Sequence, residues 1–218
     1  MRISELAESS KNVKRMGEID EAFQGRYPPL CALGRALLAE GVLLKMCRKK
    51  IKERKFFLFN DMLVYAKIAG HELYYAQRTI PLKTLDVEDV IDTFKDTLKH
   101  AWIVKSPEKS FVLIAENEDE KQHWFLNLKA CIRLLRINKE KEKIDYAPIW
   151  IPDDESNECM RCEGGKFTVF RRKHHCRKCG AIVCSGCSTR SVVIKGQGND
   201  PLRVCDACFE RFYSESES

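Results

Sequence analysis

Two stretches in the first third of the chain combine short apolar runs with charged residues in the manner of β-strands. They are residues 41–47 (GVLLKMC) and 56–68 (FFLFNDMLVYAKI), both rich in strand-forming side chains. Asn60 and Asp61 interrupt the second run, and because both residue types favour turns, this run predicts a hairpin. Further strands are expected over residues 73–81, 102–106 and 110–115. Together these runs predict several antiparallel strands.

The period of the apolar positions changes after residue 116. Asn117 precedes three acidic residues, which is typical of a helix start, because the first turn has unpaired N–H groups and favours negative charge. Apolar residues then recur on one helical face: Trp124, Leu128, Cys131, Ile132 and Leu135. The expected fold class for this part is therefore α+β and mainly β, an antiparallel sheet closed by one C-terminal amphipathic helix.

The remaining segments are polar. No stretch approaches the roughly 18–20 apolar residues that cross a bilayer. The first ten residues show neither a signal-peptide core nor a second-position glycine for myristoylation, so any membrane contact is expected to be non-covalent. The first 25–30 residues and the Ser/Glu-rich end are expected to be disordered or peripheral, and residues 136–149 to form a linker or a helix extension.

Positive charge is concentrated in two windows. The chain has 218 residues and a formal net charge of +6. Residues 45–55 hold seven Lys or Arg against one Glu, and residues 166–180 hold six Lys or Arg and no acid. Each window is therefore +6, and the rest of the chain sums to −6. Two local patches favour recognition of an anion, and an ordinary solvated charge run is the alternative.

Eight of the eleven cysteines form four C-x2-C pairs. Each pair presents two thiolates from one tight turn, and two such turns complete a tetrahedral zinc site. Spacing alone does not decide which pairs share a metal. Because the segment holds few large apolar side chains, two Zn²⁺ are expected to supply much of its folding free energy. The expected ligands are Cys159, Cys162, Cys176, Cys179, Cys184, Cys187, Cys205 and Cys208.

Three motifs that metal binding does not require surround these cysteines. They are W-x-x-D at 150–153, R-K-H-H-C-R-K-C-G at 172–180 and R-V-C at 203–205. Their combination resembles the FYVE zinc finger over residues 150–212. The resemblance implies phosphatidylinositol 3-phosphate on endosomal membranes as the ligand. It also implies cross-braced metal sites, one on Cys159, Cys162, Cys184 and Cys187, the other on Cys176, Cys179, Cys205 and Cys208.

The residues of these motifs suit a phosphomonoester. Arginine makes paired hydrogen bonds to phosphate oxygens, and histidine donates most strongly when protonated. The resemblance implies that the aspartate accepts from ring hydroxyls, where an additional phosphate would be repelled. A structural or metal-binding role for one histidine is the alternative. The candidate headgroup residues are Asp153, Arg172, Lys173, His174, His175, Arg177 and Arg203.

The loop of residues 167–170, which we call the turret, is apolar and precedes the basic run. The resemblance implies that it enters the lipid layer with Val169 and Phe170 at its tip, and an inward packing of Phe167 is the alternative for that residue. One such buried side chain contributes about 1.5–3 kcal/mol, comparable with two or three cations at about 1 kcal/mol each on an anionic surface. Insertion of these side chains and attraction of the nearby cations are expected to act jointly in anchoring the chain to the membrane.

The strands and the tryptophan-bearing helix resemble a pleckstrin homology (PH) domain over residues 36–136, which implies an antiparallel β-barrel capped by the C-terminal helix. In that family the loop between the first two strands binds a phosphoinositide headgroup, which implies Lys45, Lys52 and Arg54 as contacts. Arg48, Lys49 and Lys50 are less specific neighbours. Glu53 stands where strong binders often carry a basic residue, which argues against tight binding. A scaffold role for this domain is the alternative.

A PH-like domain and a FYVE finger in one short chain resemble the Phafin family of endosomal adaptors. The resemblance implies lipid recognition without catalysis by a cytoplasmic protein, peripheral on early endosomes with lysosomes as a second location. It further implies protein partners, not identified by the sequence, and a role in endosomal trafficking and autophagy. The expected layout is an N-terminal extension (1–35), the PH-like domain (36–136), a linker (137–149), the finger (150–212) and a tail (213–218).

Two other functions use similar features. A ubiquitin ligase of the RING type also binds zinc in a cross-brace, but it normally includes histidine among the ligands and does not need the basic motif at 172–177. A nucleic-acid binder would interleave stacking aromatics with its basic residues, which these windows do not do. No nucleic-acid partner is therefore expected, and no Gly-rich nucleotide loop or nucleophile motif is present.

Overall fold

The computed structural model of the protein describes residues 2–70, 73–90, 98–137, 144–162 and 164–214. The chain divides into two compact units, one holding the large sheet and the other the cysteine-rich region. In the part of the chain that is described, no helix is both long and apolar enough to cross a membrane.

The chain begins with two helices, α1 (Ile3–Glu8) and α2 (Ser10–Ala22). Ser9 caps α2 by accepting a hydrogen bond from the backbone N–H of Asn12 at 3.2 Å. Met16 and Ile19 on α2 are almost fully buried against the sheet, as is Phe23 just beyond it. The expectation of a disordered or peripheral N-terminus is therefore wrong for these residues, because a few apolar side chains suffice to hold the helix on the sheet.

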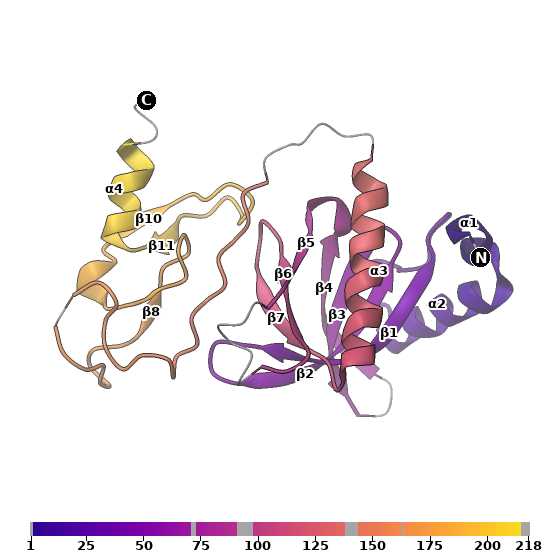
Figure 1. Ribbon diagram of the computed structural model, residues 1–218, viewed down its shortest axis with the longest axis horizontal. Helices are drawn as coiled ribbons and strands as arrows, with labels where there is room; N and C mark the ends of the chain where they lie inside the picture. Colours follow the sequence, from indigo (N-terminus) through magenta and orange to yellow (C-terminus); the bar gives the residue numbers. More distant parts are fainter. Residues whose placement is uncertain (1, 71–72, 91–97, 138–143, 163, 215–218) are drawn as a thin grey trace. The chain divides into compact units, whose positions relative to one another are not determined.

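Among the described residues, the large sheet has seven strands in the order β4-β3-β2-β1-β7-β6-β5, and Figure 1 shows α2 beside it. The hairpin predicted at Asn60 and Asp61 is confirmed, since it joins β2 to β3 in antiparallel register. The short β5 was not predicted, and it follows a 3-10 turn at Leu82–Thr84. The strands are β1 (Leu37–Met46), β2 (Ile51–Phe59), β3 (Met62–Ala69), β4 (Leu73–Pro81), β5 (Asp86–Asp89), β6 (Ala101–Lys105) and β7 (Phe111–Ile114).

The second half of β2 is buried on both faces. Residues 56–59 are all 0% exposed. The Phe56 ring makes an edge contact with Trp124, whereas Phe57 and Phe59 belong to the cluster formed with α2. A strand covered on both sides needs apolar residues at successive positions, which explains the unbroken run in the sequence.

The helix α3 (Glu118–Arg136) closes the sheet, as Figure 1 shows. Its predicted cap is confirmed, because the backbone N–H of Glu120 donates to Asn117 Oδ1 at 2.9 Å. Trp124 and Leu128 are buried on the predicted face, but Leu135 is 37% exposed and does not belong to the core.

The cysteine-rich region consists of short elements. Two small hairpins are β8 (His174–His175) with β9 (Ile182–Val183), and β10 (Arg190–Val192) with β11 (Leu202–Val204). A 3-10 turn (Ser185–Cys187) and a final helix α4 (Asp206–Ser214) complete it. Its buried cluster is half cysteine and half small or medium aliphatic side chains. The predicted fold class, a sheet capped by a helix and followed by a small finger, is confirmed.

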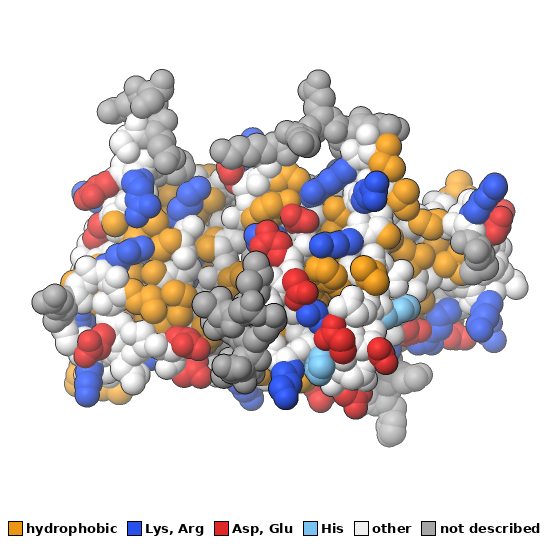
Figure 2. Space-filling model, in the orientation of Figure 1, with side chains coloured by type: hydrophobic (Ala, Val, Ile, Leu, Met, Phe, Trp, Pro, Cys, Tyr) orange, Lys and Arg blue, Asp and Glu red, His pale blue; other side chains and the backbone are white. Residues whose placement is uncertain are grey.

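The surface mixes both signs of charge. On the face drawn in Figure 2, Lys and Arg side chains lie among Asp and Glu and do not merge into one basic surface.

Candidate metal centres and cationic site

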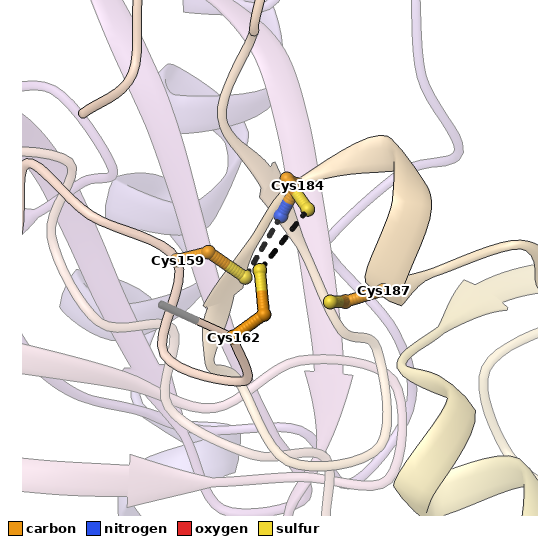
Figure 3. A group of neighbouring side chains, drawn as sticks. All are labelled: Cys159, Cys162, Cys184 and Cys187. Atoms are coloured by element: carbon orange, nitrogen blue, oxygen red, sulfur yellow. Dashed lines mark hydrogen bonds between the residues drawn. The ribbon is translucent and has the colours of Figure 1, made fainter. Parts of the chain in front are cut away.

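The first metal centre combines the first and third cysteine pairs. The sulfur atoms of Cys159, Cys162, Cys184 and Cys187 all lie within 4.8 Å of one another, and Figure 3 shows them converging. The Sγ atoms of Cys162 and Cys184 are 3.9 Å apart. A tetrahedral zinc with Zn–S bonds of about 2.3 Å places its sulfurs about 3.8 Å apart, so this donor set fits Zn²⁺.

The second metal centre combines the second and fourth pairs, Cys176 and Cys179 with Cys205 and Cys208. Here the Sγ atoms of Cys179 and Cys205 are 4.0 Å apart, again close to the zinc tetrahedron. The two groups are the cross-braced pairing that the resemblance implies, and the region holds two zinc sites. Four thiolates at each would supply all the ligands, and the metal would tie together hairpins that have little core of their own.

An arginine donates to a sulfur at each centre. Arg171 Nη2 lies 3.3 Å from Cys162 Sγ, and Arg161 Nη2 lies 3.4 Å from Cys179 Sγ. Burial raises the pKa of the Cys184 thiol, but hydrogen bonds from Arg171 and neighbouring groups outweigh it and lower that pKa to about 6. This favours the thiolate that a metal requires. The cysteine spacing carries no signal for either arginine, so neither contact was predicted.

Gly180 brings the W-x-x-D segment against the histidine motif. Its φ is +77°, and a Cβ there would lie 2.3 Å from the carbonyl oxygen of Ile149. Only glycine allows this approach, in which the backbone N–H of Ile151 donates to Gly180 O at 3.2 Å. The segment 149–153 is thereby held beside β8.

His175 is buried at the centre of this arrangement. Its ring stacks on Trp150 with centroids 5.2 Å apart, and Nε2 is 2.7 Å from the carbonyl oxygen of Ile151. Asp153 Oδ1 lies 3.6 Å from the same nitrogen. That carboxylate oxygen is buried and has no hydrogen-bond partner within the described residues. The other oxygen of this carboxylate, Oδ2, lies 3.4 Å from Arg48 Nε, so Asp153 stands between a histidine and an arginine.

Arg177 and Arg203 are brought together by the backbone. The N–H of Arg177 donates to the carbonyl of Arg203 at 2.9 Å. The Arg177 guanidinium lies 4.0 Å from the centroid of Trp150, and that of Arg203 donates to Ser188 O at 2.7 Å. Each guanidinium has five donors, so both retain donors for an anion.

The other predicted cations differ in how they are held. Lys173 donates to the backbone carbonyl of Asp153 and therefore fixes the W-x-x-D segment. Arg172 is exposed and makes no hydrogen bond or ion pair in the described part of the chain. Burial and the nearby Arg203 and Arg172 lower the pKa of His174, so its imidazole lies in a positive environment.

The turret places its tip residues in solvent. Val169 is 78% and Phe170 97% exposed, whereas Phe167 packs against the cysteine cluster. The inward packing left open for Phe167 is therefore observed.

The PH candidates lie near the start of β2 and at the end of β1. Lys52 and Arg54 are partly buried and two residues apart, so they share one face of β2. Lys45 is only 3% exposed, and its Nζ lies 5.6 Å from the centroid of the Tyr65 ring. A strand pattern cannot show that a neighbouring aromatic covers this lysine.

Known families match both parts of the chain. Residues 149–214 match the FYVE zinc finger, and residues 30–131 match the SOS1/NGEF-like PH domain.

Similar proteins span most of the chain. Pleckstrin homology domain-containing family F member 2 of Gallus gallus is 39% identical over 210 residues, covering 95% of this chain and 84% of that protein. Member 1 of Homo sapiens is 38% identical over 215 residues, covering 98% and 76%. Among solved structures, the DH/PH domains of PDZ-RhoGEF in complex with activated RhoA align at 17% identity and a TM-score of 0.48, covering 57% of this chain and 40% of that chain.

Proposed function

The chain belongs to the pleckstrin homology domain-containing family F, the Phafin family, and is a phosphoinositide-binding adaptor that associates peripherally with membranes; we propose that its FYVE finger recognises phosphatidylinositol 3-phosphate. The PH domain serves as a second, weaker phosphoinositide site. The protein acts by recognition without catalysis, recruiting protein partners to early endosomes, and to lysosomes, in endosomal trafficking and autophagy.

One observation carries the headgroup assignment: several arginines gather around β8, and the W-x-x-D segment held beside β8 carries a buried acceptor without a hydrogen-bond partner in the described residues. Arg177, Arg203 and Arg172 supply donors for phosphate oxygens, and their arrangement depends on the zinc-bound hairpins. Asp153 Oδ1 supplies the acceptor for an inositol hydroxyl. Arginine donors next to a carboxylate acceptor favour an inositol ring that carries one phosphate beside a free hydroxyl.

The acceptor also supports the choice of a singly phosphorylated lipid. A second phosphate at the ring position facing Asp153 would bring like charges together in a partly buried site. Lipids phosphorylated on neighbouring ring positions are therefore rejected.

Membrane residence combines three weak contributions. The turret tip offers Val169 and Phe170 for insertion, and the cations beside it face an anionic surface. Lys52 and Arg54 add a second headgroup site. Two weak sites that bind the same membrane lengthen the time for which the chain stays bound. Binding at the first site raises the effective concentration of lipid at the second.

The test is sedimentation of the full chain with liposomes that each carry a single phosphoinositide. We expect binding to phosphatidylinositol 3-phosphate, weakened about tenfold or more by Arg172→Ala, because a charge-assisted phosphate contact is lost. The double change Val169→Ser with Phe170→Ser should reduce liposome binding but leave the affinity for a soluble, short-chain form of the lipid nearly unchanged. Arg54→Ala should cause a smaller loss.

Lys178→Ala is the matched control, since it removes one exposed positive charge from the same window outside the candidate site. Equal binding to all phosphoinositides, or equal losses in Arg172→Ala and Lys178→Ala, would contradict specific recognition. Tighter binding to a labelled oligonucleotide than to liposomes would favour nucleic acid instead.

A further inference from the structure

The turret is closed by a hydrogen-bonded turn. The backbone N–H of Thr168 donates to the carbonyl of Arg171 at 3.0 Å, and the N–H of Arg171 donates to Thr168 Oγ1 at 3.1 Å. Val169 and Phe170 lie between these two residues at the tip. The direction in which the tip points therefore depends on the contacts that fix Thr168 and Arg171.

The Arg171 side chain points to the first metal centre. Its Nη2 donates to Cys162 Sγ at 3.3 Å, and a Cβ at Gly164 would lie only 2.4 Å from the same nitrogen. Glycine at that position leaves room for the guanidinium over the first cysteine pair. The adjacent Arg172 is exposed, so two neighbouring arginines have separate environments.

A bound metal would strengthen this contact. Four thiolates and one Zn²⁺ carry a formal charge of about −2, which a guanidinium partly neutralises by charge-assisted hydrogen bonding to sulfur. The metal would also fix the position of Cys162, because its sulfur would be a ligand. Groups that hydrogen-bond to metal ligands commonly tune both metal retention and ligand orientation.

We propose that Arg171 is a positioning residue that links the zinc centre of Cys159, Cys162, Cys184 and Cys187 to the membrane-inserting turret. This inference rests on the proposed function. Cys162, which would be held as a zinc ligand, fixes the Arg171 guanidinium, and the closed turn presents Val169 and Phe170 toward the lipid. Arg171 acts on insertion and on metal retention, whereas the headgroup is bound by other residues.

The test compares three full-length variants. Arg171→Met removes the guanidinium with little change in length. Gly164→Ala keeps the charge but displaces the guanidinium by its new Cβ. Lys166→Met is the control, since it removes an exposed positive charge from the same loop without a contact to sulfur.

Three measurements separate the possible causes. They are insertion into lipid monolayers that contain phosphatidylinositol 3-phosphate, affinity for the soluble short-chain lipid, and the rate of zinc release to a chelator. We expect Arg171→Met and Gly164→Ala to reduce insertion about fivefold and to accelerate release of one of two zinc equivalents, with soluble-lipid affinity within about twofold of the parent. Lys166→Met should show only a small loss of insertion and normal zinc release.

Equal insertion by Arg171→Met and Lys166→Met would overturn the proposal, because charge alone would then account for the effect. Normal zinc release and normal insertion in Gly164→Ala would overturn it as well. If the parent chain bound no phosphatidylinositol 3-phosphate, the proposed function would fail, while zinc release would still decide whether Arg171 supports the metal centre.

Discussion

Glu40 on β1 joins three elements of the sheet-bearing unit. Its Oε1 accepts from Arg15 Nε on α2 at 2.7 Å, and its Oε2 lies 3.1 Å from Lys55 Nζ on β2. The Arg15 hydrogen bond lowers the pKa of Glu40 below its usual range, and this outweighs the opposite effect of burial. The native state therefore holds the Glu40 proton more weakly than the unfolded chain does.

Replacing Glu40 by Gln should lower the free energy of unfolding by about 1–2 kcal/mol near neutral pH. Because the folded pKa lies below the unfolded value of about 4.3, the contribution is present above that value and is lost as pH falls through the folded pKa. The difference in the free energy of unfolding between parent and variant should thus become smaller in acid. Urea unfolding followed by near-ultraviolet circular dichroism measures it.

Glu18→Gln is the control for this experiment. Glu18 also accepts from Arg15, at 2.8 Å, but its side chain is 44% exposed, so the loss should stay below about 0.5 kcal/mol. If the Glu40 variant lost the same free energy of unfolding in acid as at neutral pH, the predicted link between the pKa of Glu40 and stability would be contradicted.

At the scale of elements, α2 with Phe23 forms part of the sheet's core. The Phe23 ring contacts Phe57 on β2 with centroids 6.2 Å apart and Tyr74 on β4 at 5.5 Å. The Asn12 side chain also pairs with the backbone of Leu37, donating at 2.8 Å and accepting at 3.0 Å. The helix thus satisfies backbone groups at the start of β1 as well as covering apolar rings.

Phe23→Ala should destabilise the sheet-bearing unit by about 3–5 kcal/mol, because it removes a buried ring and leaves a cavity. Val13→Ala, at a position on α2 that is 42% exposed, should change stability by less than about 0.5 kcal/mol. Thermal unfolding of both variants gives the comparison. A loss for Phe23→Ala as small as that for Val13→Ala would show that the helix is dispensable.

At the scale of the whole molecule, zinc changes the charge as well as the stability. Eight thiolates and two Zn²⁺ would shift the formal charge of +6 to about +2. A nearly neutral chain has weak long-range attraction to an anionic membrane. Membrane contact must then depend on the local cationic sites and the turret.

Removing zinc should unfold the cysteine-rich region and spare the large sheet. Half of the region's buried cluster is cysteine, whereas the sheet encloses Trp102 and Trp124 at 0% and 2% exposure. After a strong chelator under reducing conditions, hydrogen exchange should become fast in residues 158–208 and remain slow in β2 and β3. Slow exchange in both regions with zinc fully removed would contradict a metal-dependent fold.

Sequence patterns predicted the elements whose partners are local or repetitive. The hairpin at Asn60 and the cap at Asn117 are set by neighbouring residues. The helix α2 was missed because its charged sequence gives few apolar positions, and its partners, such as Tyr74, lie far along the chain. The strand β5 was missed because it is four residues long and includes three acids.

The site shows the same division. Cysteine spacing predicted eight metal ligands but not their grouping, which depends on how the hairpins fold back. The sequence could not distinguish Arg171 from Arg172, since they are adjacent and identical in type. Their different environments follow from the turn that begins at Thr168 and from the space above Gly164.

The packing of α2 on the sheet also bears on the order of synthesis. The apolar side chains of Met16, Ile19 and Phe23 emerge from the ribosome before their partners on β2 to β4 do. At about 5–20 residues per second, roughly 3–10 seconds separate Phe23 from Tyr74. During that interval the nascent helix exposes its apolar face, so a chaperone that shields apolar segments would act on α2 during synthesis.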